Sequence, residues 1–116
     1  MLKKINQIKK LSYKIRKIIL DISYNCGEPS HIGGALSIVE ILSVIYSYFD
    51  IRINKPLDRF ILSKGHGFLA LLSVLHCKGF IKKKKDLLQF QKNESEFIAH
   101  PIMNKSIGIE TSNGSL

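Results

Sequence analysis

The apolar residues of the first 24 positions recur every third or fourth residue, and this spacing limits the fold more than any other feature of the sequence. The lysines between them fall on the opposite side of a helix drawn through the same positions. The spacing predicts one long amphipathic helix over residues 1–24, which ends before Asn25-Cys26-Gly27. The apolar positions are Leu2, Ile5, Ile8, Leu11, Ile15, Ile18, Ile19 and Ile22.

A second, more apolar helix is predicted over residues 34–49. The surrounding stretch, residues 32–49, just reaches the length of a membrane span. However, Ser37, Glu40, Ser43 and Ser47 recur along it at helical spacing and give one face a polar stripe. A charged Glu40 near the middle would cost about 2.5–3.5 kcal/mol in a bilayer. We therefore expect a largely buried helix and no membrane association.

The rest of the chain is predicted to alternate short elements with loops. The turn residues around Pro56 precede a short apolar strand, and the next helix stops where Gly79 follows it. From Ala99 onward the sequence is typical of a loop. The predicted elements are a turn at 54–58, a strand at 60–62, a helix at 68–78 and a short helix that opens at 82–85.

The charge balance is strongly basic, with 18 Lys and Arg against 9 Asp and Glu in 116 residues. That length supports one domain near the lower end of the usual size range. The lysines gather on the first helix and at residues 82–85, with few arginines and no nucleic-acid-binding motif. We interpret them as solvated helix faces and expect no nucleic-acid partner. Cys26 and Cys77 lie far apart without metal-ligand spacing, which is typical of reduced thiols in a cytoplasmic protein.

Three of the four histidines lie in loops marked by Gly or Pro, namely His31, His66 and His100. The first two each precede a predicted helix, whose N-terminus suits an anionic group such as phosphate. Gly65 and Gly67 would let a ligand approach the backbone. Each histidine taken singly is more often a surface or capping residue, and the spacing names no ligand. By contrast, His76 lies inside a predicted helix and is interpreted as a partly buried structural residue.

Five ordered blocks of sequence carry a resemblance to a known family. Together they resemble the amino-terminal part of transketolase, especially the N-terminal subunit of split transketolases, from about Leu11 to the last residue. Deoxyxylulose-phosphate synthase shares the first block, but a different tripeptide precedes its second histidine. The blocks are residues 30–37 (SHIGGALS), 40–42 (EIL), 58–66 (DRFILSKGH), 100–101 (HP) and 108–116 (GIETSNGSL).

The resemblance implies an α/β fold, with residues 1–116 as the mostly helical, N-terminal portion of a thiamine-diphosphate-binding domain built on a doubly wound parallel sheet. It implies a metal-dependent transferase of carbohydrate metabolism, which moves a two-carbon ketol unit between sugar phosphates with thiamine diphosphate and Mg²⁺. Carried over by position, His31 and His100 would be catalytic. The cofactor would be bound by His66, Gly65, Gly114 and Leu116.

The metal-binding motif of the family would follow the last residue of this sequence, so no metal ligand is predicted here. We therefore expect a truncated chain that is inactive alone. Its partner would be a C-terminal transketolase subunit or the missing remainder, in a dimer of the complete cytoplasmic enzyme. The alternative is a non-catalytic basic helical interaction module, a relic of a transketolase gene.

Overall fold

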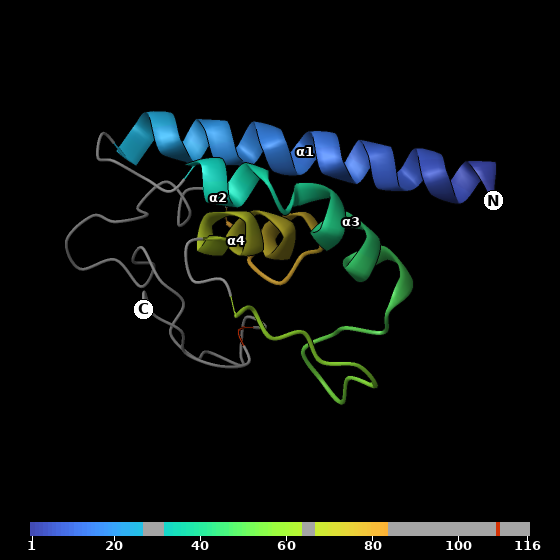
Figure 1. The fold of residues 1–116 in the computed structure, drawn as a ribbon. Helices are drawn as coiled ribbons and strands as arrows, with labels where there is room; N and C mark the ends of the chain where they lie inside the picture. Colours follow the sequence, from blue (N-terminus) through green and yellow to red (C-terminus); the bar gives the residue numbers. More distant parts are fainter. Residues whose placement is uncertain (27–31, 64–66, 84–108, 110–116) are drawn as a thin grey trace.

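Helices make up nearly all the regular structure in the described part of the chain (Figure 1). The structure is a computed structural model of residues 1–116, and it describes residues 1–26, 32–63, 67–83 and 109. The helices are α1 (Leu2–Cys26), α2 (Ile32–Leu36), α3 (Val39–Tyr48) and α4 (Phe68–Cys77). The predicted helix over residues 1–24 is confirmed as α1, which continues for two more residues.

The apolar stripe of α1 is buried from its middle onward. Ile15, Ile19 and Ile22 are fully buried, whereas Leu2 near the N-terminus is 72% exposed. The reason is coverage, because α2, α3 and α4 all pack against the same side of this longer helix (Figure 1). The first turns of α1 reach past most of these partners, so the regular sequence pattern is only partly matched by burial.

The predicted helix over residues 34–49 is wrong as a single element. The chain forms α2 and α3 instead, separated by Ser37 and Ile38. The Ser37 hydroxyl donates to the Gly34 carbonyl at 2.9 Å, and the Ile38 amide donates to the Ala35 carbonyl at 3.3 Å. Both bonds span three residues and compete with the regular four-residue ladder. The break lets α2 and α3 each turn an apolar face to the core.

The polar stripe of α3 lies against α1. Along this antiparallel contact, Lys4 donates to the Ser47 carbonyl at 2.7 Å, and the Ser12 hydroxyl donates to Ser43 Oγ at 2.9 Å. Arg16 completes the series with an ion pair to Glu40. We call these three pairs the α1–α3 polar seam. Ser43 is fully buried, so part of the stripe lies in the interior and helps align the two helices.

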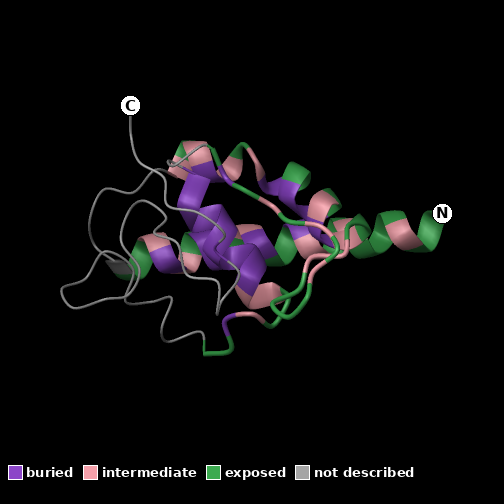
Figure 2. Cartoon of the chain, turned by 90° about the horizontal axis from the view of Figure 1, so that it is seen from below, coloured by how far each residue is buried: buried purple, intermediate pink, exposed green. Residues whose placement is uncertain are grey.

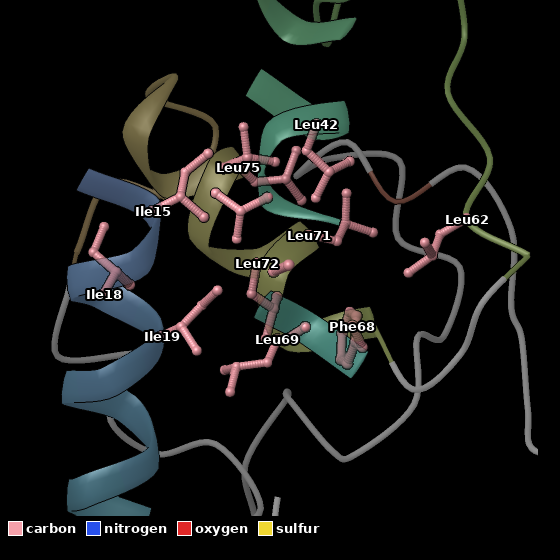
Figure 3. Packing of buried hydrophobic residues seen from close by; sticks show 14 of the residues in the cluster. Ile15, Ile18, Ile19, Leu42, Leu62, Phe68, Leu69, Leu71, Leu72 and Leu75 are labelled. Atoms are coloured by element: carbon pink, nitrogen blue, oxygen red, sulfur yellow. The ribbon is translucent and has the colours of Figure 1, made fainter. Parts of the chain in front are cut away.

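Helix α4 forms the centre of the core. Every residue from Phe68 to Leu75 is buried, and α1, α2 and α3 all contact the helix (Figure 2). Figure 3 shows Ile15 and Ile19 of α1 extending toward the leucines of α4. A helix that is apolar on all sides is stable in water only when other elements enclose it.

The predicted end of α4 at Gly79 is confirmed, with the last helical residue at Cys77. Gly79 has φ +86°, a conformation that favours glycine. Its amide donates to the His76 carbonyl at 3.0 Å, and the Phe80 amide donates to the Leu75 carbonyl at 2.8 Å. This pair of bonds is the Schellman arrangement that closes many helices.

The strand predicted at residues 60–62 is wrong, because the structure assigns no strand to this segment. Its side chains do alternate: Leu62 is buried, Ile61 is exposed, and the Phe60 ring packs edge-on to Tyr46 with centroids 5.7 Å apart. An extended segment becomes a strand only when another strand pairs with it. Among the described residues, an isolated bridge at Ile109 is the sole β assignment, and the implied parallel sheet is not seen there.

Two further expectations concern the ends of the described segments. Lys82 and Lys83, where a short helix was expected to open, are not helical, and the remainder of that helix lies outside the described residues. The loop predicted from Ala99 lies outside them too, apart from Ile109. None of the helices in the described segments has both the length and the apolar character that a membrane span needs.

Candidate functional site

All six residues that the sequence assigned to catalysis or cofactor binding lie outside the described residues. The structure therefore leaves the site predictions untested, and they remain predictions. Within residues 1–26, 32–63, 67–83 and 109, no three His, Cys, Asp or Glu side chains gather where they could share a metal ion. The six are His31, Gly65, His66, His100, Gly114 and Leu116.

The structure does place the helices that follow two of these histidines. Ile32, the residue after His31, begins α2, and Gly67, the residue after His66, is the N-cap of α4. Helices α2 and α4 contact each other within the core. Consecutive Cα atoms are about 3.8 Å apart, so each of the two histidines is joined by one peptide to an element of this packed pair.

The environment of Gly67 differs from the role that the sequence suggested for it. A Cβ at this buried position would lie 2.6 Å from Ile38 Cδ1 and 3.8 Å from Leu62 Cδ1. A side chain of the protein, rather than a ligand, therefore occupies the space that the glycine leaves. Ile38 is the link between α2 and α3, so Gly67 allows the start of α4 to approach that link closely. Gly65 lies outside the described residues.

The block Glu40-Ile41-Leu42 has a structural role in the described part of the chain. Leu42 is buried in the core, and Ile41 is exposed. The Glu40 carboxylate is exposed and pairs with Arg16, whose hydrogen bond is the main reason that the pKa of Glu40 is lowered. Burial acts on the pKa in the opposite direction and is outweighed. Glu40 thus stays charged to a lower pH than an unpaired glutamate.

Asp58, which opens the third block, closes a loop. Its carboxylate accepts a hydrogen bond from the Asp50 amide at 2.8 Å, and its own amide donates to the Asp50 carbonyl at 3.0 Å. The side-chain carboxylate of Asp50 lies 3.2 Å from Arg52. These contacts join the two ends of the turn after α3. The sequence showed the turn residues but not the residue that ties the turn together.

The structural role predicted for His76 is confirmed. The side chain is half-buried in the last turn of α4, and its Nδ1 donates to the Ile81 carbonyl at 2.7 Å. This bond ties the segment after Gly79 back to the helix. His76 is accordingly a useful contrast to the three loop histidines.

Comparison with known proteins identifies the family. The model of the transketolase thiamine diphosphate binding domain matches residues 8–116. The transketolase of Buchnera aphidicola subsp. Acyrthosiphon pisum is 32% identical over 114 residues, which cover 93% of this chain and 17% of that protein. Transketolase 1 of Pasteurella multocida is 31% identical and transketolase 1 of Escherichia coli K12 is 29% identical, with the same shares covered. The chain thus spans about a sixth of the length of these relatives. On the strength of the family match, which includes all five sequence blocks, the chain belongs to the transketolase thiamine diphosphate binding domain family.

Proposed function

We propose that this chain contributes the cofactor-binding part of a transketolase, which transfers a two-carbon ketol unit between phosphorylated sugars. The family match over residues 8–116 carries this proposal, because it includes all six predicted site residues. Curated relatives named transketolase that align with 93% of the chain support it further. The non-catalytic relic is supported by no observation in the described residues.

The three loop histidines would divide the work at the site. His31 would move protons near the reacting carbon, and His100 would hold a hydroxyl of the donor sugar beside the transferred carbons. An imidazole suits both tasks because it donates or accepts a proton near neutral pH. His66 would contact the cofactor diphosphate. Thiamine diphosphate, when bound, supplies the carbanion chemistry that no side chain provides.

The described start of α4 is compatible with an anionic cofactor group. Its first turn contains no acidic residue. No described carboxylate on this turn therefore opposes a diphosphate near the positive end of the helix dipole. Gly65 would bring backbone to the same ligand, and Gly114 and Leu116 would border it elsewhere.

We assign Mg²⁺ to the complete enzyme and to no residue described here. The described segments hold no cluster of metal-ligating side chains, so we derive no step through the metal. The chain also spans 17% of the length of the relatives. We therefore propose that it acts together with further transketolase polypeptide, either a C-terminal subunit or a continuation of the chain. The complete enzyme would be a cytoplasmic dimer.

A chimera tests this proposal. Residues 8–116 would replace the aligned segment of the E. coli transketolase 1, and cofactor affinity and donor dependence would be measured. We expect activity in the chimera, none in the 116-residue chain alone, and no Mg²⁺-dependent tight binding of thiamine diphosphate by that chain in calorimetry. Mg²⁺-dependent tight binding by the chain alone would refute its dependence on further polypeptide.

Histidine variants of the chimera test the individual roles. We expect His66→Ala to weaken cofactor binding and His100→Ala mainly to raise the donor concentration needed for half-maximal rate. His76→Asn is the matched control, because its partner is the Ile81 carbonyl of the fold itself. It should lower thermal stability and leave cofactor affinity unchanged. If the His66 and His100 variants match the control both in cofactor affinity and in the donor concentration needed for half-maximal rate, the assigned roles are wrong.

A further inference from the structure

A hollow of about 420 Å³ opens between the N-terminal half of α1 and the C-terminal ends of α3 and α4. Its polar lining includes the lysines at positions 4, 10, 14 and 78, together with Gln7 and Ser47. Lys4, Lys10 and Lys14 come from α1, while Lys78 follows the last turn of α4. The fold thus brings together charges that lie more than 60 positions apart in the sequence. From the sequence we interpreted the lysines of α1 as solvated helix faces, and we did not predict that they would line one hollow.

Among the described residues, no carboxylate lines this hollow. The ion pairs seen among the described residues are Arg16–Glu40 and Arg52–Asp50, and neither involves a lysine of the hollow. Four ammonium groups around one concavity repel each other, and a bound anion would relieve that repulsion. The lining is therefore complementary to a ligand with several negative charges.

One of the cations, Lys4, is held by neighbouring groups. Lys4 Nζ donates to the Ser47 carbonyl at 2.7 Å and lies 5.0 Å from the centroid of the Tyr48 ring. Part of the entropy cost of ordering this side chain is therefore met in the fold itself.

Lys14 and Lys78 both lie close enough to Cys77 to oppose the effect of burial, which raises the pKa of its thiol. Cys77 therefore senses the charge of the hollow.

The basic lining continues beyond the first hollow. A neighbouring hollow of about 320 Å³ shares Lys14 and Cys77 with it and adds Lys17 and His76. The two concavities lie side by side along α1, with Lys14 between them. A ligand with more than one anionic group could therefore contact lysines in both.

We propose that these two hollows bind a small, multiply phosphorylated anion. Their volumes suit a small molecule, since ligand pockets usually measure about 300–1,000 Å³. Lysine binds phosphate oxygens as a point charge. The lysines converge on a concavity, whereas a nucleic acid would need cations that follow an extended backbone. This second anion site uses none of the residues assigned to the thiamine diphosphate site.

The reactivity of Cys77 tests the proposal in the 116-residue chain. A Cys26→Ser background leaves Cys77 as the single thiol, and inorganic tripolyphosphate is the probe. The reaction of Cys77 with a small neutral thiol reagent should slow about fivefold or more at saturating tripolyphosphate. The bound anion would cover the thiol, and it would also offset the positive charge of the lysines that favours the thiolate. Sodium chloride matches the ionic strength throughout.

A matched pair of variants separates the hollow from the general charge of α1. Lys10→Gln/Lys14→Gln removes two charges from the lining, and we expect about tenfold weaker protection by tripolyphosphate. Lys3→Gln/Lys9→Gln removes two exposed charges of the same helix that line neither hollow. In this variant tripolyphosphate should protect Cys77 as well as it does in the parent. Lys78→Gln repeats the test from outside α1 in case the first variant folds poorly.

Four results would overturn the proposal. The parent chain could show no protection, or sulfate at matched ionic strength could protect as well as tripolyphosphate. The Lys3/Lys9 control could lose as much protection as the Lys10/Lys14 variant, which would leave net charge as the cause. A short DNA duplex that protects at a lower phosphate concentration than tripolyphosphate would assign the surface to nucleic acid instead.

Discussion

The buried hydroxyl pair of the α1–α3 polar seam makes a quantitative prediction about stability. Ser43 is fully buried and Ser12 is 7% exposed, so water competes little for their hydrogen bond of 2.9 Å. The Ser43 hydroxyl in turn donates to the Val39 carbonyl at 2.8 Å, and Ser12 Oγ lies 3.0 Å from the Ile8 carbonyl. A double-mutant cycle of Ser12→Ala and Ser43→Ala isolates the contact between the helices.

Each single variant should lose about 0.5–1.5 kcal/mol of unfolding free energy, the usual net value of one such bond. The first substitution already breaks the shared bond, so the double variant should lose less than the sum of the two, with a coupling of about 0.5–1 kcal/mol. Urea unfolding followed by helical circular dichroism measures all four proteins.

Ser73→Ala is the control for this cycle. This serine is also buried, but its hydroxyl donates to the Leu69 carbonyl of its own helix at 2.8 Å. Alanine has the higher helix propensity, so we expect little loss of stability or a small gain. Additive losses in the cycle, or a Ser73→Ala loss as large as the Ser43→Ala loss, would refute the view that the hydroxyl pair joins α1 to α3.

Three other predictions follow from contacts described above. Because Arg16 lowers the pKa of Glu40, the ion pair should stabilise the fold above pH 4.5 and lose that effect as the pH falls through the lowered pKa. At this exposed site the difference in unfolding free energy between the parent and Glu40→Gln should stay below about 1 kcal/mol and vanish at low pH. Gly67→Ala should destabilise the chain by about 1–2 kcal/mol in urea unfolding, and Ile38→Val should recover part of the loss because it removes the Cδ1 atom that the new Cβ would meet; an equal loss with and without Ile38→Val would exclude this contact as the cause. Gly79→Ala should cost about 1 kcal/mol because φ is +86° there, and a thermal melt unchanged from the parent would contradict that conformation.

The parts of the fold that were predictable are those determined by local pattern. The repeat of apolar residues predicted α1 to within two residues of its end, and Gly79 marked the end of α4. The break at Ser37 was missed, because residues 34–49 keep a continuous apolar character across it. What divides α2 from α3 is a hydroxyl bond to Gly34 and a tightened turn, and neither changes the apolar pattern.

Features that depend on distant residues were harder to predict. The alternation of Phe60, Ile61 and Leu62 is real, yet an extended segment needs a pairing partner that local sequence cannot reveal. The polar stripe on α3 was visible, but the sequence did not show that it meets α1. For the candidate site, the ordered motifs identified the family. The three loop histidines of that site lie outside the described residues.

Helix α4 has one more consequence for how this domain can vary. In a helix with one apolar face, that face determines which side of the helix turns toward the core. Every residue of α4 from Phe68 to Leu75 is buried, so its own sequence does not determine its rotation about the helix axis. The shapes of α1, α2 and α3 must therefore determine which way each leucine of α4 points. A change of volume at any position from Phe68 to Leu75 is felt by a neighbouring helix, so substitutions in α4 should be accepted mainly together with compensating changes in the helices that enclose it.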